Sequence, residues 1–225
     1  MTREAKREAV RAAPVYLVTE ESLSAGRTTE AVVDAALDAG VRVVQVREKG
    51  GHVRRALAIG EALRRLTAAV GAILIVNDRV DLALAIGADG VHVGQDDLPL
   101  AVVRTLVGPD SVIGLSITAP DQLEADDARA CDYLGVGSVY PTGSKGDAAL
   151  TGLPLLGQAR ASSSLPIVAI GGISVANAAE VVAAGADSVA VISAISGAPD
   201  PRGAARQLAE AVALAIARRV GTGRG

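Results

Sequence analysis

The sequence has almost no aromatic side chains: three tyrosines, no phenylalanine and no tryptophan in 225 residues. Proteins that bind single-stranded nucleic acid stack its bases on aromatic side chains, so this class is disfavoured. The chain also carries 22 basic against 25 acidic residues, a formal net charge of −3. It therefore lacks the basic surface typical of DNA- or RNA-binding proteins, and we expect no nucleic-acid partner.

Cysteine and histidine are scarce too, with one cysteine and two histidines. A single cysteine, Cys131, excludes an intrachain disulfide framework and fits a reducing cytoplasm. These three side chains cannot supply the four ligands of a structural zinc site. No uncharged apolar run approaches the ~18 residues of a transmembrane helix, and the first 13 residues have no apolar core of a secretory signal. We expect a cytoplasmic protein with no membrane partner.

What the sequence does have is a regular alternation of two kinds of segment. Half of the residues are hydrophobic and the mean hydropathy is +0.36, so a large core can be built from Ala, Val, Leu and Ile. Short β-branched runs bounded by Gly or Asp predict buried parallel strands over residues 15–19, 42–47, 72–77, 89–93, 111–116, 132–139, 166–170 and 188–192. Longer Ala-, Leu-, Arg- and Glu-rich runs predict helices over residues 28–39, 53–70, 80–86, 98–106, 120–130, 153–160, 175–184 and 201–219.

Eight strand–helix units in series predict a parallel sheet with helices outside it. They favour closure into a single (β/α)₈ TIM barrel, a fold of ~250 residues that can be as short as ~200. An open doubly wound sheet is the alternative. However, Thr19-Glu20-Glu21-Ser22 follows the first strand, where that fold would place Gly-x-Gly-x-x-Gly. We expect a charged N-terminal segment (1–13), an α/β barrel (14–219) and a flexible tail (220–225).

Polar residues follow the second, third and fourth strands, at the end where barrel enzymes place their active sites. Gln45, Arg47 and Lys49 share one face by the two-residue period of a strand, and this pattern indicates an anion clamp. Asp78 and Asp97 follow the next two strands, and Mg²⁺ is commonly held by one or two carboxylates plus substrate phosphates. Each feature has an alternative role. The clamp residues could be a solvated strand end, Asp78 could pair with Arg79 or cap the next helix, and Asp97 could cap the helix that begins at Leu98.

A second anion site is indicated after strands six to eight. The segment after the sixth strand is long, rich in hydroxyls and glycine, and contains Lys145. Gly171-Gly172 follows the seventh strand and Ser193 the eighth, where barrels often bind phosphate through backbone N–H groups. Two anionic substrates held together, one with a divalent metal, suggest displacement of diphosphate. His92, inside an apolar strand, is expected to be packed and hydrogen-bonded rather than a base.

Over residues 15–195 these motifs resemble those of the thiamine-phosphate synthase family. The matching segments are Gln45-Val46-Arg47-Glu48-Lys49, Asn77-Asp78-Arg79, and residues 90–97, 135–142 and 169–173. The resemblance implies a (β/α)₈ transferase that joins 4-amino-2-methyl-5-(diphosphooxymethyl)pyrimidine to 4-methyl-5-(2-phosphooxyethyl)thiazole or its carboxylated form. It also implies that thiamine phosphate and diphosphate are formed by a Mg²⁺-dependent, dissociative displacement.

The same resemblance implies a role for each matching residue. Asp78 and Asp97 would bind magnesium, and Arg47, Lys49 and Lys145 would be catalytic by stabilising the leaving diphosphate. The pyrimidine diphosphate would be held by Gln45, Arg47, Lys49, Asn77, Ser116 and Lys145. The thiazole phosphate would be held by Thr142, Ser144, Gly172, Ile192 and Ser193.

Two positions depart from the family pattern: Thr118 stands where a histidine is usual, and Gly143 where a proline is usual. Two other functions remain as alternatives, a thiazole tautomerase on the same barrel and a non-catalytic barrel that binds thiamine phosphate. A tautomerase needs a proton-transfer group and no metal. The aspartate pair and Lys145 therefore favour the synthase. The sequence does not decide the oligomeric state, and a homo-oligomer is one possibility.

Overall fold

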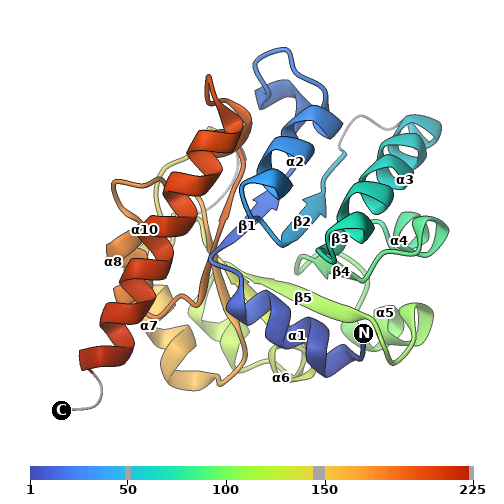
Figure 1. Cartoon of the computed structure of the whole chain (residues 1–225). Coiled ribbons are helices and arrows are strands. Elements are labelled where there is room, and N and C mark those ends of the chain that lie inside the picture. The colour runs from blue at the N-terminus through green and yellow to red at the C-terminus, as the bar shows by residue number, and fades with distance from the viewer. Residues whose placement is uncertain (49–51, 144–149, 223–225) are drawn as a thin grey trace.

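The computed structural model describes residues 1–48, 52–143 and 150–222 (Figure 1). Eight parallel strands pair in chain order and β8 pairs back with β1, so the predicted closed α/β barrel is confirmed. The strands are β1 (Val15–Val18), β2 (Val43–Val46), β3 (Ile73–Asn77), β4 (Gly90–Val93), β5 (Val112–Ile117), β6 (Tyr133–Val136), β7 (Ile167–Ile170) and β8 (Ser188–Val191).

The helices follow the strands in the expected order. They are α1 (Arg3–Ala12), α2 (Thr29–Asp38), α3 (Val53–Ala69), α4 (Val80–Ile86), α5 (Leu100–Val107), α6 (Asp126–Ala130), α7 (Gly152–Ser162), α8 (Ala178–Ala183), α9 (Ser193–Ser196) and α10 (Pro201–Thr222), with 3₁₀ turns η1 (Glu21–Leu23) and η2 (Pro120–Leu123). Among these, no helix is both long and apolar enough to cross a membrane.

One predicted helix, 120–130, is wrong as a single element. It is divided into η2 and α6, because Ala125 between them has extended backbone angles (ψ 149°) that cannot continue a helical hydrogen-bond ladder. The side chain of Gln122 also accepts the backbone N–H of Thr118 at 2.7 Å, which closes a tight turn. Three elements were not predicted: the 3₁₀ turn η1, the single turn α9, and α1 within the charged N-terminal segment. Thr2 accepts the N–H of Ala5 at the start of α1.

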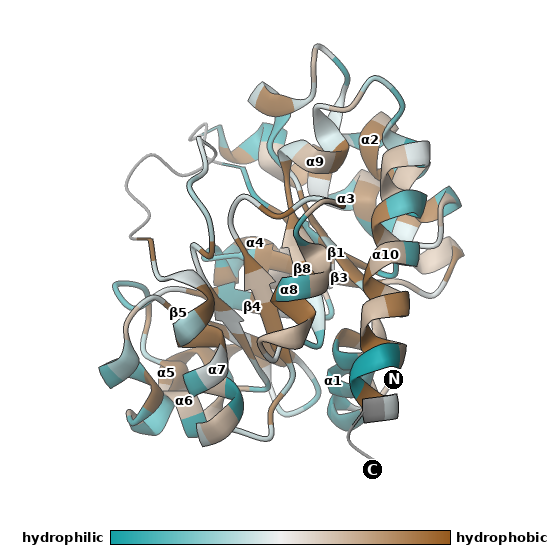
Figure 2. Ribbon diagram, turned by 90° about the vertical axis from the view of Figure 1, so that its left-hand side faces the viewer, coloured by the Kyte–Doolittle hydropathy of each residue, from teal (hydrophilic) through white to brown (hydrophobic). Residues whose placement is uncertain are grey.

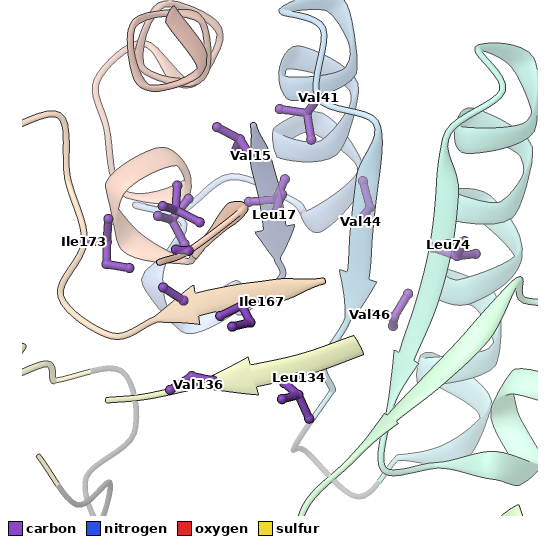
Figure 3. Close-up of a cluster of buried hydrophobic side chains, with 14 of the residues drawn as sticks. Val15, Leu17, Val41, Val44, Val46, Leu74, Leu134, Val136, Ile167 and Ile173 are labelled. Atoms are coloured by element: carbon purple, nitrogen blue, oxygen red, sulfur yellow. The ribbon is translucent and has the colours of Figure 1, made fainter. Parts of the chain in front are cut away.

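Alternate strand residues point outward and pack under the helices. Figure 3 shows Val44 and Val46 of β2 and Leu134 and Val136 of β6 within this layer. Figure 2 shows hydrophobic residues on the central strands, whereas the outer helices carry both hydrophobic and hydrophilic residues. Because a strand side chain changes face at every residue, the remaining positions must point into the barrel.

The barrel interior has an apolar layer at the N-terminal end of the strands. It includes Val43, Ile73 and Val112, and Val10 of α1 packs into the same cluster. In Figure 1, α1 lies across this end of the barrel. Two residues further along β2, the inward position is Gln45, so the interior becomes polar toward the C-terminal ends of the strands.

Three aspartates, Asp89, Asp132 and Asp187, fasten the N-terminal end of the barrel. Each immediately precedes an even-numbered strand and accepts a backbone N–H from the strand before it, at 2.8–3.0 Å. Each also pairs with a basic side chain of α1, in order Lys6, Arg3 and Arg11. Arginines of α3, α5 and α7 also pair with them, in order Arg64, Arg104 and Arg160. Charge thus ties α1 to the barrel at the end opposite the predicted site.

Candidate active site

A pocket opens among the C-terminal halves of the strands. Its volume is about 410 Å³ when the open space at its mouth is included. It is lined by Tyr16, Val18, Gln45, Arg47, Asn77, His92, Ser116, Tyr133, Gly135, Val168, Ile170 and Ala190. The barrel therefore brings together four of the residues predicted to hold the pyrimidine diphosphate. Gln45 lies in β2 and Arg47 directly after it, whereas Asn77 lies in β3 and Ser116 in β5.

Arg47 is the one lysine or arginine among the described residues that line this pocket. It follows β2, and its backbone N–H donates to Thr19 Oγ1 at 3.0 Å. The side chain is only 2% exposed, and one guanidinium nitrogen pairs with Glu20 at 2.5 Å. A second nitrogen, NH2, is buried with no hydrogen-bond partner in the described part of the chain. An unsatisfied buried cationic donor is unfavourable, and an anion in the pocket would satisfy it.

The residue after Arg47, Glu48, is acidic and half-buried. Burial raises the pKa of the Glu48 carboxyl, the negative charge of Glu21 raises it further, and Arg55 opposes the shift. One oxygen of Glu48 is buried without a hydrogen-bond partner among the described residues. Of Arg47 and Glu48, only Arg47 lines the pocket.

The two predicted metal ligands lie at the ends of neighbouring strands. Asp78 follows β3, and its backbone N–H donates to the carbonyl of His92 on β4 at 2.8 Å. The backbone of Asp78 is left-handed, with φ 60°, and Asn77 donates to its carboxylate at 2.5 Å. The Asp97 carboxylate turns back toward β4 and accepts the N–H of Gly94 at 2.7 Å.

The alternative roles of these aspartates involve Arg79 and the helix that follows Asp97. Arg79 pairs with Asp81, and α5 begins at Leu100 with Pro99 as its capping residue. No group of three or more His, Cys, Asp or Glu side chains suited to a metal occurs in residues 1–48, 52–143 and 150–222. Asp78 and Asp97 are carboxylates of the kind that suit Mg²⁺, which keeps several waters and binds substrate phosphates.

The second anion site is predicted at the loops after β6, β7 and β8. Gly171 and Gly172 have positive φ, 105° and 62°. A Cβ atom on Gly172 would lie 2.7 Å from the Pro141 carbonyl oxygen and 2.7 Å from the Cβ atom of Tyr140. Only glycine therefore allows this loop to pack against the loop after β6, which also contains the half-buried Thr142. The short helix α9 begins at Ser193, directly after Ile192.

Three predicted site residues lie outside the described residues: Lys49, Ser144 and Lys145. Their roles stay predictions. Thr118, the first departure from the family pattern, hydrogen-bonds to Gln122 in its own turn and does not line the pocket.

Sequence reasoning missed two pocket residues, Tyr16 and Tyr133. Their hydroxyl oxygens lie 2.9 Å apart inside the barrel, although 117 residues separate them. The expected hydrogen bonding of His92 is confirmed, because its Nδ1 contacts the Tyr133 hydroxyl at 3.1 Å and its Nε2 contacts Ser116 Oγ at 2.9 Å. The two-residue period could have placed both tyrosines on inward positions, but not in contact with each other.

Comparisons with known proteins agree on one family. Residues 15–195 match the family model described as thiamine monophosphate synthase. A thiamine-phosphate synthase of Natronomonas pharaonis is 50% identical over 201 residues, which cover 88% of this chain and 94% of that protein. One from Haloquadratum walsbyi is 47% identical over 196 residues, covering 86% and 88%. The solved structure of a thiamine phosphate pyrophosphorylase from Pyrococcus furiosus superposes with a TM-score of 0.84 and 37% identity, covering 93% of this chain and 99% of that one.

Proposed function

Because the chain belongs to the thiamine monophosphate synthase family, it is a transferase that forms thiamine phosphate and diphosphate, and we propose how its site does so. Its substrates are 4-amino-2-methyl-5-(diphosphooxymethyl)pyrimidine and 4-methyl-5-(2-phosphooxyethyl)thiazole. We place the pyrimidine diphosphate in the barrel pocket. We place the thiazole phosphate at the loops after β6, β7 and β8. Its proposed contacts are Thr142, Gly172, Ile192 and Ser193, together with Ser144, which lies outside the described residues.

The buried guanidinium of Arg47 carries this assignment. One of its guanidinium nitrogens is buried without a partner among the described residues, and Arg47 lines the same pocket as Gln45, Asn77 and Ser116. These amide and hydroxyl groups can hydrogen-bond to a polar aromatic ring, whereas the cation suits the diphosphate attached to that ring. One cavity thus contains partners for both parts of the first substrate.

Asp78 and Asp97 are the residues that would hold Mg²⁺. When bound there, Mg²⁺ would neutralise negative charge on the diphosphate as it leaves. Arg47 would act on the same charge from β2, together with Lys49 and Lys145. Preorganised cations of this kind stabilise the transition state more than the bound substrate, which is the condition for catalysis.

The reaction then needs little more from the chain than positioning. The bond between the pyrimidine methylene carbon and the diphosphate oxygen breaks first, and the oxygen keeps the electron pair. The lone pair of the thiazole nitrogen forms the new C–N bond to that carbon. This nitrogen carries no proton, so no general base is required, and holding the two substrates in line supplies much of the acceleration.

The decisive experiment follows diphosphate release with both substrates, with and without Mg²⁺. We expect release only when both substrates and the metal are present. Asp78→Asn and Asp97→Asn should lose magnesium-dependent turnover, whereas the matched control Asp96→Asn should keep it. If both variants turn over normally, the metal assignment is wrong. Aromatisation of the thiazole carboxylate phosphate without metal would indicate the tautomerase, and binding without turnover would indicate a non-catalytic barrel.

We also propose that the enzyme works in the cytoplasm. The lone Cys131 is free and buried, and burial raises the pKa of its thiol to about 12. A thiol held in this neutral form is an inert packing residue, which agrees with a reducing compartment.

A further inference from the structure

Five polar side chains form one continuous hydrogen-bonded row across the barrel interior. Gln45 Nε2 donates to the Tyr16 hydroxyl at 2.8 Å, and that hydroxyl contacts the Tyr133 hydroxyl at 2.9 Å. Tyr133 contacts His92 Nδ1 at 3.1 Å, and His92 Nε2 contacts Ser116 Oγ at 2.9 Å. The row begins and ends on residues that we assign to the pyrimidine, but its three middle members have no role so far.

The barrel is built to accommodate this row. Gly114 on β5 is in register with His92 on one side and Tyr133 on the other. A Cβ atom on Gly114 would lie 2.1 Å from the Tyr133 ring and 2.4 Å from His92 Nδ1. A Cβ atom on Gly135 would lie 2.6 Å from the His92 ring. Glycines at these inward positions therefore leave the space that the two rings occupy.

The hydrogens of the row can be assigned by counting donors and acceptors. Burial raises the pKa of the Tyr16 and Tyr133 phenols above their usual value, so each keeps its hydrogen. The amide nitrogen of Gln45 can only donate, so the Tyr16 hydrogen must go to the Tyr133 oxygen. Among the residues that the structure describes, the Tyr133 hydrogen then has one acceptor, Nδ1 of His92.

The direction continues to the end of the row. Since Nδ1 accepts, the ring hydrogen of neutral His92 is on Nε2 and is donated to Ser116. The hydroxyl hydrogen of Ser116 is then left for an acceptor in the pocket. At the other end, Gln45 uses its nitrogen on Tyr16, which leaves its side-chain oxygen as an acceptor for the pocket.

We propose that Tyr16, Tyr133 and His92 are positioning residues that make Gln45 present an acceptor and Ser116 a donor, and thereby select an aminopyrimidine. This inference rests on the proposed placement of the pyrimidine in the pocket. The 4-amino group of that ring donates hydrogen bonds and its ring nitrogens accept them, which complements the two ends. A 4-oxo pyrimidine would direct an oxygen at the Gln45 oxygen, and a site with buried polar groups rejects such a mismatch strongly.

The first test determines the direction of the hydrogen bonds along the row from the tautomer of His92. The chain has only two histidines, so ¹⁵N-histidine labelling gives two ring systems, and a His52→Gln variant assigns them. We expect substrate-free His92 to carry its hydrogen on Nε2. A hydrogen on Nδ1 would reverse the row and overturn the proposal.

The second test measures the preference for an amino over an oxo pyrimidine. It compares the inhibition constants of two unreactive inhibitors, the monophosphates of the 4-amino and 4-oxo pyrimidine methanols. We expect the wild type to bind the amino compound at least roughly tenfold more tightly, the equivalent of one hydrogen bond. In Tyr16→Phe the Gln45 amide can turn, so the ratio of the two inhibition constants should fall toward one. Tyr133→Phe should lower the ratio and shift the His92 tautomer, and in both variants KM for the thiazole phosphate should be unchanged.

Tyr140→Phe is the matched control, because this third tyrosine bonds to Glu180 outside the row. It should leave the inhibitor ratio and the tautomer unchanged. An unchanged ratio in both Tyr16→Phe and Tyr133→Phe would overturn the proposal even if the enzyme is fully active. Failure of the wild type to release diphosphate would instead overturn the proposed function, and the tautomer would still decide the direction of the row.

Discussion

Asp132 offers the sharpest test of how α1 and the barrel are held together. Its side chain has no exposed surface, and its two oxygens accept Arg3 Nε at 2.5 Å and Arg104 NH2 at 2.7 Å. One of them also accepts the backbone N–H of Ile113 at 2.8 Å. The substitution Asp132→Asn keeps the volume and one oxygen, but it removes the negative charge and points an NH₂ donor at a cationic donor.

The expected cost follows from these contacts. Removing one partner of a buried ion pair typically costs about 3–5 kcal/mol, because the remaining charge stays without compensation. The two arginine side chains are 41% and 25% exposed, so water solvates them in part and we expect the lower end, about 3 kcal/mol. For a chain of this size each kcal/mol shifts the melting temperature by about 2–4 °C, so Asp132→Asn should melt roughly 6–12 °C lower.

Thermal unfolding followed by far-ultraviolet circular dichroism measures this, since the chain has no tryptophan for fluorescence. The control is Asp126→Asn, whose exposed carboxylate lies 3.6 Å from Arg129 on the surface and should leave the melting temperature unchanged. KM for both substrates should also be unchanged at low temperature, because Asp132 lies at the end of the barrel opposite the site. A shift below about 2 °C in Asp132→Asn would refute the view that this carboxylate anchors the barrel.

Three further predictions concern the site and the tyrosines. Gly172→Ala should raise KM for the thiazole phosphate roughly tenfold, about one lost hydrogen bond, because the added Cβ meets a backbone oxygen at 2.7 Å. Gly26→Ala, with φ 80° and nothing within 4 Å, controls for backbone strain alone, and an equal effect of both would refute the steric reason. Burial and the hydrogen bond to Glu180 raise the pKa of Tyr140 to about 12. Because the pKa of Tyr140 in the folded protein exceeds the usual ~10, its contribution to the free energy of unfolding should be fully present below pH ~10 and be lost as the pH rises toward 12. Near-ultraviolet absorbance that shows Tyr140 ionising near pH 10 would contradict this. Lys145→Ala should lower kcat by roughly 10²–10³ in steady-state assays, and an unchanged kcat would remove Lys145 from leaving-group stabilisation.

Much of the architecture could be predicted because strands and helices have different periods. A parallel strand buried on both faces is a nearly continuous apolar run, such as residues 72–77, where β3 is found. The short helix predicted over residues 80–86 agrees with α4 at both ends. The predicted helix over 120–130 failed because no glycine or proline marks Ala125, where the backbone becomes extended.

The location of the site could be predicted for a geometric reason. The C-terminal ends of parallel strands meet at one end of a closed barrel, so polar residues that follow several strands must converge. Gln45, Asn77 and Ser116 do line one pocket. The roles of Asp78 and Asp97 stay predictions, although Arg79 pairs with Asp81 and α5 begins only at Leu100.

The scarcity of aromatic residues has a different meaning once the fold is known. Two of the three tyrosines, Tyr16 and Tyr133, are in the pocket and hydrogen-bond to each other across 117 residues. Composition excluded base stacking, but it could not show that the remaining aromatics belong to the site. Their contact requires β8 to close on β1, because only closure brings inward side chains of β1 and β6 to the centre.

The sequence by itself determined the eight-unit barrel, the end of the barrel that does chemistry and the residue types available there. These depend on periodicity and on order along the chain, which a sequence contains. The tertiary structure alone decided which side chains share a hydrogen bond. It showed that the aspartates before β4, β6 and β8 hold α1, and that a histidine and two tyrosines connect Gln45 to Ser116. Partners so distant in sequence meet only through the register and closure of the sheet, which no local pattern encodes.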